Sequence, residues 1–148
     1  MKTLKTLAVV VIAALTFSLT SCTKSAEDLI IGTWESTNFT MTSVASGYTG
    51  EYAVLNGTRT ETENGNTTLT FKDNGTVVST TVEDGHTETE TGTYKVEDDD
   101  LILTYDGVTM TMDIDNIDKK SMTLTYSESG EDDGQTYTTT IVMKMKRV

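Results

Sequence analysis

The sequence predicts an all-β protein in which a single antiparallel up-and-down meander of eight strands, or nine, closes into a barrel. Three observations support this fold class. Threonine occurs 32 times in 148 residues and proline is absent, a composition that favours strands over helices. Six Asn-Gly or Asp-Gly pairs, which are preferred in tight hairpin turns, recur along the chain. Between them, polar and apolar residues alternate with the period of two that is typical of strands.

The first 21 residues have the features of a lipoprotein signal peptide. Lys2 and Lys5 form a short basic region, and an apolar stretch follows over residues 7–19. This stretch is shorter than the ~20 residues that a membrane-spanning helix needs, and its length suits a secretory signal. It ends in LTSC at residues 19–22, which resembles the lipobox of bacterial lipoproteins. The resemblance implies cleavage before Cys22 and attachment of lipid to its sulfur.

Residues 22–30 are expected to form a lipidated polar tether that holds the rest of the chain at a membrane. Two or three acyl chains give stable anchoring, whereas one chain gives only marginal binding. No aspartate follows Cys22 directly, so the common signal for retention in the inner membrane is missing. We therefore expect an outer-membrane lipoprotein of the cell envelope, with the periplasmic and the surface face both open.

Residues 31–148 are expected to form one domain of short strands. The strands are predicted near residues 31–41, 51–60, 66–72, 76–83, 87–96, 101–105, 108–114, 121–127 and 136–146. The second of these is weak, and we expect the Gly- and Thr-rich segment 43–66 around it to form the longest loop or a lid. No stretch of this region shows the apolar period of 3.6 residues that indicates a helix.

The turn positions predict how neighbouring strands pair. A two-residue loop at Asp106-Gly107 places Tyr105 opposite Val108 and Leu103 opposite Met110, and a loop over 97–100 places Tyr94 opposite Leu103. All these apolar side chains then share one face, and a slip of one residue would turn them outward. In the same way, a two-residue loop at Asn74-Gly75 predicts that Phe71 lies opposite Val78.

A meander with a single apolar face has two economical forms, a closed barrel and a β-sandwich. Closure removes the exposed edge strands, which matters in a Thr-rich chain that has no proline to protect them. About eight strands give an interior that side chains can fill or that can hold one small ligand. The barrel is therefore the prediction and the β-sandwich its alternative.

Charge and composition exclude several classes of function. The formal net charge is −12, and it becomes −14 without Lys2 and Lys5, so we expect no nucleic-acid binding. A single Cys and a single His exclude a disulfide framework, a zinc cluster and a haem-attachment motif. His86 follows a turn with no nucleophile beside it, so we predict no catalytic residue, no enzyme activity and no cofactor. Acidic runs at 97–100, 113–118 and 131–133 suit solvated loops; weak calcium binding at one of them stays open, and no metal site is predicted.

Four short motifs follow the lipobox in a recognisable order. They are GTW at residues 32–34, LTF at 69–71, GTY at 92–94 and LILT at 101–104. This order resembles the small lipocalin-like lipoproteins of Bacteroidetes, and the resemblance covers the whole chain after the signal peptide. It implies that Trp34 plugs the closed end of the barrel and that a basic residue near the last strand packs over it. Lys144, Lys146 and Arg147 are the candidates for that basic residue.

The inward face supplies the candidate ligand-binding residues. They are Phe71, Tyr94, Leu103, Tyr105, Met110, Met112, Leu124, Tyr126 and Met143, with Met145 beside them. Methionine side chains accommodate apolar ligands of varied shape, and tyrosine hydroxyls orient a polar head. The resemblance implies a monomeric protein that binds a small hydrophobic or amphipathic ligand. The alternative is a filled barrel that acts as an envelope protein-interaction module or as a hydrolase inhibitor.

Overall fold

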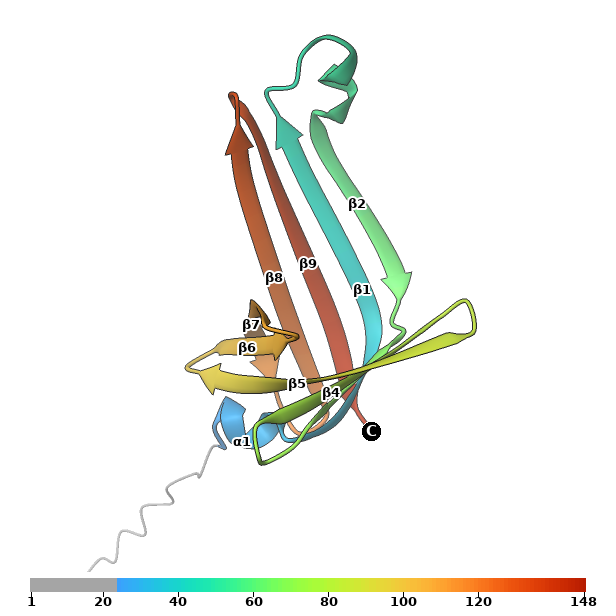
Figure 1. Cartoon of the computed structure of the whole chain (residues 1–148), viewed down its shortest axis with the longest axis vertical. Helices are drawn as coiled ribbons and strands as arrows, with labels where there is room; N and C mark the ends of the chain where they lie inside the picture. Colours follow the sequence, from blue (N-terminus) through green and yellow to red (C-terminus); the bar gives the residue numbers. More distant parts are fainter. Residues whose placement is uncertain (1–23) are drawn as a thin grey trace, which may run out of the picture.

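The computed structural model describes residues 24–148 and shows a closed antiparallel β-barrel with a long projecting arm (Figure 1). The predicted signal peptide and the predicted lipidation site at Cys22 lie outside the described residues. Within residues 24–148, no helix is both long and apolar enough to cross a membrane.

Residues 24–148 contain one short α-helix, one 3₁₀ helix and nine strands. In chain order they are α1 (Ala26–Ile30), β1 (Gly32–Ser46), the 3₁₀ helix η1 (Gly50–Leu55), β2 (Gly57–Asn64), β3 (Thr67–Phe71), β4 (Thr76–Glu83), β5 (His86–Glu97), β6 (Asp100–Tyr105), β7 (Val108–Ile117), β8 (Ser121–Asp132) and β9 (Gln135–Arg147).

Strand β1 closes the barrel because it pairs on both of its edges. One edge pairs with β9 from Trp34 to Ser46. The other edge changes partner: residues 32–35 pair with β3, whereas residues 38–45 pair with β2. Eight strands therefore form the closed ring and β2 is the ninth, added beside the upper half of β1. The predicted barrel is confirmed, and the sandwich alternative is not what the chain adopts.

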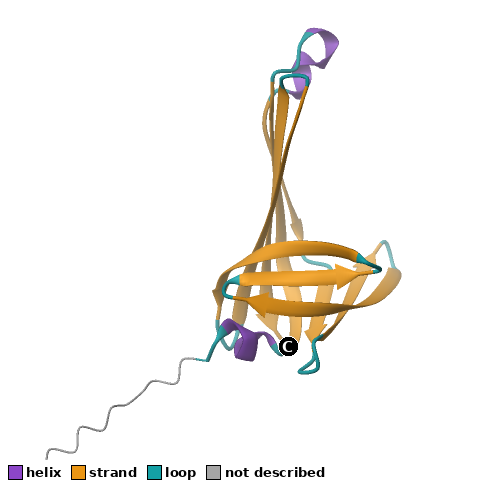
Figure 2. Ribbon diagram, turned by 60° about the vertical axis from the view of Figure 1, so that its left-hand side comes forward, coloured by secondary structure: helices purple, strands orange, loops and turns teal. Residues whose placement is uncertain are grey.

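The arm is a four-stranded sheet that rises well above the rest of the barrel (Figures 1 and 2). It consists of residues 38–64 and 126–141, which are β2, η1 and the adjoining parts of β1, β8 and β9. The expectation that residues 43–66 form a loop or lid is wrong, because parts of β1 and the whole of β2 lie within this segment. The strand predicted at 51–60 is a 3₁₀ helix over its first half, and its last residues belong to β2. The alternating Thr and Glu residues of β2 are all exposed, so no apolar face marked this segment as a strand.

The predicted registers around β6 are confirmed. Tyr105 lies opposite Val108, Leu103 opposite Met110, and Tyr94 opposite Leu103. The turn between β6 and β7 has φ values of 48° at Asp106 and 82° at Gly107. Positive φ at both central residues is the geometry for which Asp-Gly is preferred in two-residue hairpins.

The predicted register at the turn between β3 and β4 is wrong by one residue. Phe71 pairs with Val77 rather than with Val78. The loop has three residues instead of two, because Gly75 takes the left-handed conformation with φ of 78° after Asp73 and Asn74. This extra residue brings Val77 into the core, where it is fully buried.

The core occupies the end of the barrel opposite the arm. Helix α1 lies at this end (Figure 2), and its last residue, Ile30, is fully buried. The helix begins at Ser25, whose Oγ accepts a hydrogen bond of 3.2 Å from the backbone N–H of Asp28. Helix α1 thus occupies residues 26–30 of the segment 22–30 that was expected to be a tether. The buried apolar side chains are Ile30, Trp34, Leu69, Phe71, Val77, Leu101, Leu103, Met112, Ile114, Met122, Leu124 and Met145.

Candidate functional site

The end of the barrel beside α1 is sealed by Trp34 and Arg147. Trp34 is fully buried, and its Nε1 donates a hydrogen bond of 2.7 Å to the carbonyl oxygen of Ile30. The guanidinium carbon of Arg147 lies 4.2 Å from the centre of the indole ring, which is a cation–π contact. Since Trp34 pairs with Arg147 across β1 and β9, the two side chains lie on the same face of the sheet.

Arg147 also ties three chain segments together. Its guanidinium donates to the carbonyl oxygens of Ile31 at 2.7 Å, Lys119 at 3.0 Å and Leu29. Of the three basic candidates for the contact with Trp34, it is therefore Arg147 that makes it. Lys146 instead forms a surface ion pair of 3.0 Å with Glu35.

Three of the predicted ligand-binding residues belong to the packed core. Phe71 and Leu124 are buried, and the ring of Tyr94 meets that of Phe71 edge-to-face with 4.9 Å between centroids. The hydroxyl of Tyr94 donates a hydrogen bond of 2.8 Å to the carbonyl oxygen of Lys72. Burial and the nearby carboxylates of Asp73 and Glu27 raise the pKa of Tyr94. None of these three side chains lines a cavity in the described part of the chain.

Above this core the barrel encloses a pocket of about 410 Å³ at the base of the arm. A volume of this size lies within the range of about 300–1,000 Å³ that is usual for small-molecule sites. Six predicted residues are brought together in its wall: Leu103, Tyr105, Met110, Met112, Tyr126 and Met143. Six further lining residues were not among the candidates: Phe39, Thr67, Leu69, Ser79, Glu90 and Ile141. The pocket is mostly apolar, with few polar groups.

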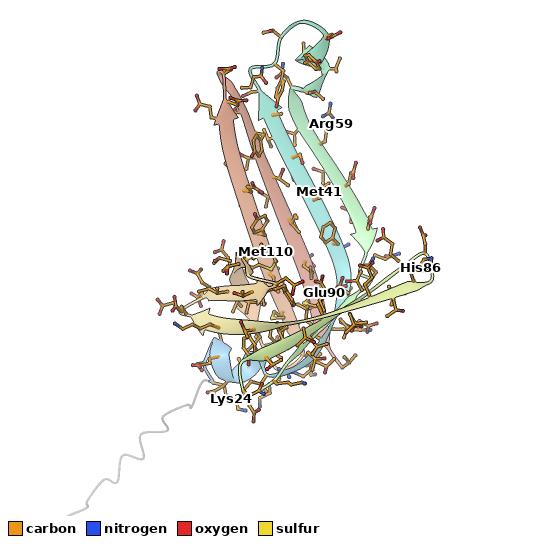
Figure 3. The ribbon with its side chains drawn as sticks, viewed as in Figure 1. Lys24, Met41, Arg59, His86, Glu90 and Met110 are labelled. Carbon is orange, nitrogen blue, oxygen red and sulfur yellow. The ribbon has the colours of Figure 1, made fainter. Side chains whose placement is uncertain are left out.

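Those polar groups gather on one side of the pocket. Ser79 and Glu90 lie opposite each other on β4 and β5, and Figure 3 shows Glu90 near the base of the arm. The hydroxyl of Tyr105 is buried and has no hydrogen-bond partner. Burial raises the pKa of Tyr105, the carboxylate of Glu90 raises it further, and the hydroxyl of Ser79 lowers it to a smaller extent. The hydroxyl of Ser79 thus lies close enough to that of Tyr105 to act on its pKa, but the two make no hydrogen bond of normal geometry, and the Tyr105 donor stays unpaired near the carboxylate of Glu90.

Phe39 and Glu90 were missed for different reasons. A β-bulge between Ser36 and Asn38 shifts the alternation of β1, so that Phe39 faces inward although it is an odd number of residues from Trp34. A single unpaired residue of this kind leaves no mark in the sequence. Glu90 belongs to an alternating Thr-Glu run whose side chains are exposed, so burial did not mark it as a pocket residue although it lines the pocket. Its pairing with Ser79, which itself pairs with the buried Leu69, is the signal that register reasoning could have used.

Replacing Tyr105 with phenylalanine is expected to stabilise the protein by about 1 kcal/mol, because a buried hydroxyl without a partner costs free energy. The Tyr105→Phe variant also tests whether the pKa of Tyr105 is raised in the folded protein. Since burial raises the pKa of Tyr105, the unfolded state ionises first, near pH 10. The contribution of Tyr105 to the free energy of unfolding is then constant below about pH 10 and falls as pH rises toward the folded-state pKa. Urea unfolding at pH 7 to 11 measures both effects.

The matched control for Tyr105→Phe is Tyr137→Phe, because Tyr137 lies in the arm with 43 % of its surface exposed. This control should leave the free energy of unfolding unchanged at pH 7. A loss of stability in Tyr105→Phe would contradict the structure, as it would mean that the hydroxyl makes a favourable hydrogen bond. Equal alkaline destabilisation of Tyr105→Phe and the unsubstituted protein would contradict the assigned cause.

Other candidate chemistry does not converge on a site. His86 lies exposed at the end of the hairpin of β4 and β5, away from the arm (Figure 3). Residues 24–148 contain no group of three His, Cys, Asp or Glu side chains arranged to hold a metal ion. The Asp118 carboxylate accepts hydrogen bonds from the backbone N–H groups of Lys120 and Ser121, which lower its pKa. It caps a turn instead of joining an acidic cluster.

Together, the sealed end, the up-and-down ring of eight strands and the pocket at the other end define a calyx of the lipocalin type. The sequence comparison agrees: residues 30–143 match the lipocalin-like domain family. The chain belongs to this family. No curated protein matches it in sequence.

Two solved structures with TM-scores above 0.5 show the same fold at low sequence identity. Lobster apocrustacyanin A1 superposes with a TM-score of 0.52 at 14 % identity, covering 80 % of this chain and 61 % of that protein. Apocrustacyanin C1 superposes with a TM-score of 0.53 at 15 % sequence identity, covering 83 % of this chain and 63 % of that protein. A lipocalin-like protein from Bacteroides uniformis has a TM-score of 0.48 at 11 % sequence identity, covering 80 % of this chain and 98 % of that protein.

Proposed function

We propose that this protein is a lipoprotein of the outer membrane that binds a small hydrophobic or amphipathic molecule in its barrel. The pocket at the base of the arm is the observation that carries the proposal. It is about 410 Å³ in volume and lined mainly by Leu, Ile, Met, Phe and Tyr side chains. Such a lining removes the apolar surface of a ligand from water, which is the main source of affinity for small apolar molecules.

The unpartnered hydroxyl of Tyr105 supports the same proposal. A buried hydroxyl without a hydrogen bond costs about 1–3 kcal/mol, and a polar group of a ligand would remove that cost. The sealed floor at Trp34 and the open side toward the arm leave one route of entry, so an apolar tail would enter first.

The experiment is to purify residues 24–148, which contain every strand and the whole core, and to measure the native mass before and after organic extraction. A small molecule that is lost on extraction, together with a fall in melting temperature, supports the proposal. Binding of the neutral fluorescent probe N-phenyl-1-naphthylamine gives a second readout. Ile141→Trp should fill the pocket and abolish probe binding, because Ile141 lines it.

The control for Ile141→Trp is Val142→Trp, its neighbour on β9, which faces the other side of the sheet and should bind the probe normally. A protein that carries no molecule and binds no probe would overturn the proposal. So would an Ile141→Trp variant that folds and still binds the probe with unchanged affinity.

The membrane anchor is tested separately in the full chain. Cys22→Ala should move the protein from the membrane fraction to the soluble fraction and abolish incorporation of labelled fatty acid. Membrane association that is unchanged in Cys22→Ala would contradict lipidation at this residue.

A second candidate function is a protein-interaction module, and the tip of the arm favours it. Tyr52 and Val54 on η1 are 59 % and 74 % exposed, and Val44, Leu55 and Tyr137 nearby are also exposed. Val54→Ser and Tyr52→Ser should abolish capture of an envelope partner without affecting probe binding, if this tip is the contact surface. Exposed apolar side chains gathered at one point mark contact surfaces more often than scattered ones do.

A further inference from the structure

The face of the sheet that lines the pocket carries glutamates where it extends beyond the pocket. Glu90 is part of the pocket wall. Glu88 lies two residues before it on β5, opposite Thr81, and therefore shares its face of the sheet. On the arm, Glu63 pairs with the lining residue Phe39, and Glu61 pairs with Met41, which itself pairs with the lining residue Ile141. Directly opposite residues in antiparallel strands share a face, so these carboxylates all lie on the pocket side.

A further carboxylate comes from β8 on the same face. Glu128 accepts a hydrogen bond of 3.2 Å from the hydroxyl of the lining residue Tyr126, and this bond raises the pKa of Tyr126. Strands from three parts of the chain thus place negative charge around the mouth of one apolar pocket.

These five glutamates lack cationic partners. Within residues 24–148 the ion pairs are Lys95–Glu97 and Lys146–Glu35, and neither involves the mouth. Arg59 lies on this face of β2, opposite Ser43, but its guanidinium donates to the carbonyl oxygen of Val54 at the tip, 2.6 Å away. The mouth therefore keeps an uncompensated negative charge, which raises the local concentration of cations and repels anions.

The upper wall of the pocket adds a second, independent feature. Three aromatic rings, those of Phe39, Tyr105 and Tyr126, line it together with Glu90. Aromatic faces attract ammonium groups, and quaternary ammonium ligands are recognised by aromatic side chains for this reason. The polarisable methionine sulfur of Met110 also lines the pocket. Aromatic rings, one carboxylate and an apolar floor together match one kind of ligand.

We infer that the pocket selects amphiphiles that have a cationic ammonium head and an apolar tail. This inference rests on the proposed function and names the class of ligand for the same site. The tail occupies the lower pocket among Leu69, Leu103 and Met112, next to the core. The head lies beside Glu90 and the aromatic rings, at the level of the Tyr105 hydroxyl. An anionic head of the same size would meet Glu90 without any compensating cation, and repulsion of this kind is a common source of specificity.

The test compares three probes with one tail: decyltrimethylammonium, decanol and decyl sulfate. Each is titrated into residues 24–148 by calorimetry below its critical micelle concentration. Decyltrimethylammonium should bind about tenfold more tightly than decanol, and decyl sulfate should bind most weakly. Raising the salt concentration should weaken binding of the cation and leave that of decanol unchanged, since salt screens exposed charges.

Glu90→Gln keeps the shape of the side chain and removes its charge. It should reduce the affinity for decyltrimethylammonium about tenfold and leave that for decanol unchanged. The matched control is Glu51→Gln, the same substitution on η1 at the tip of the arm, which should alter neither affinity. Circular dichroism confirms that both variants fold.

The outcomes separate this inference from the proposed function. Equal affinities for the three probes, or an unchanged cation affinity in Glu90→Gln, would overturn the selection of cations while ligand binding stands. If none of the three probes binds, and N-phenyl-1-naphthylamine does not bind either, the proposed function fails and this inference fails with it.

Discussion

Replacing Trp34 with alanine is expected to lower the free energy of unfolding by about 3–5 kcal/mol, the usual cost of truncating a fully buried aromatic side chain. Trp34 is fully buried, so its removal leaves a cavity under helix α1. The change also removes the hydrogen bond from Nε1 to the carbonyl oxygen of Ile30 and the ring that Arg147 covers. Since marginal stability is typical of a domain this size, the loss could approach the total.

Urea unfolding followed by far-UV circular dichroism is the appropriate measurement for Trp34→Ala, because Trp34 is the single tryptophan and its fluorescence disappears with it. Trp34→Phe is the control: it keeps a ring under the guanidinium and loses the Nε1 donor, so about 1–2 kcal/mol should be lost. If Trp34→Ala does not fold, the loss of free energy of unfolding can still be measured in Trp34→Phe. Unchanged unfolding midpoints in both variants would contradict the role of Trp34 as the seal.

Replacing Arg147 with lysine is expected to cost about 2 kcal/mol, although the charge is kept, because an ammonium cannot reproduce the planar fork of donors. The guanidinium of Arg147 reaches the carbonyl oxygens of Leu29, Ile31 and Lys119. A lysine side chain can satisfy one of these at a time. Loss of the other bonds loosens the contact between α1, the turn before β8 and the end of β9.

Lys146 offers a matched control one residue away. Lys146→Ala removes the exposed ion pair with Glu35, and exposed pairs of this kind contribute about 0–1 kcal/mol. Chemical denaturation of both variants should therefore show a much larger shift for Arg147→Lys than for Lys146→Ala. Equal shifts would mean that Arg147 acts only as a surface charge.

Turn chemistry explains why much of the fold could be predicted from the sequence. At Asp106-Gly107, two residues with positive φ fix the pairing of β6 with β7, and apolar side chains on one face leave a single acceptable register. At Asn74-Gly75 the same type of dipeptide takes part in a three-residue loop. The dipeptide alone does not distinguish the two loop lengths, so the prediction there was wrong by one residue.

The arm could not be predicted because its strands bury neither face completely. Strand β2 is exposed along its entire length, and its pairing with β1 rests on backbone hydrogen bonds and threonine contacts such as Thr40 with Thr62 and Thr42 with Thr60. Apolar alternation reports burial, and it carries no information about a strand without a buried face.

The sequence did not decide between a barrel filled by side chains and a hollow barrel. In the structure, the end beside α1 is a packed core and the region above it holds the pocket. Leu124 and Met112 have the same place in the alternating pattern and both are buried, yet only Met112 also lines the pocket. Which layer a side chain joins depends on how far the neighbouring strands extend and on the bulge near Ser36. Alternation gives the face of a residue and not its height along the barrel.

The sealed end and the long strands β1 and β9 give the molecule a direction. The described chain begins near the sealed end at Lys24 (Figure 3), whereas the wall of the pocket includes Phe39 and Ile141 of the arm. A body held by the proposed lipid anchor at Cys22 would stand with its sealed end toward the membrane and its pocket facing away from it. Cargo would be exchanged with the aqueous space in front of the protein and not drawn from the lipid layer beneath it, and the arm would be the first part to meet whatever delivers or receives that cargo.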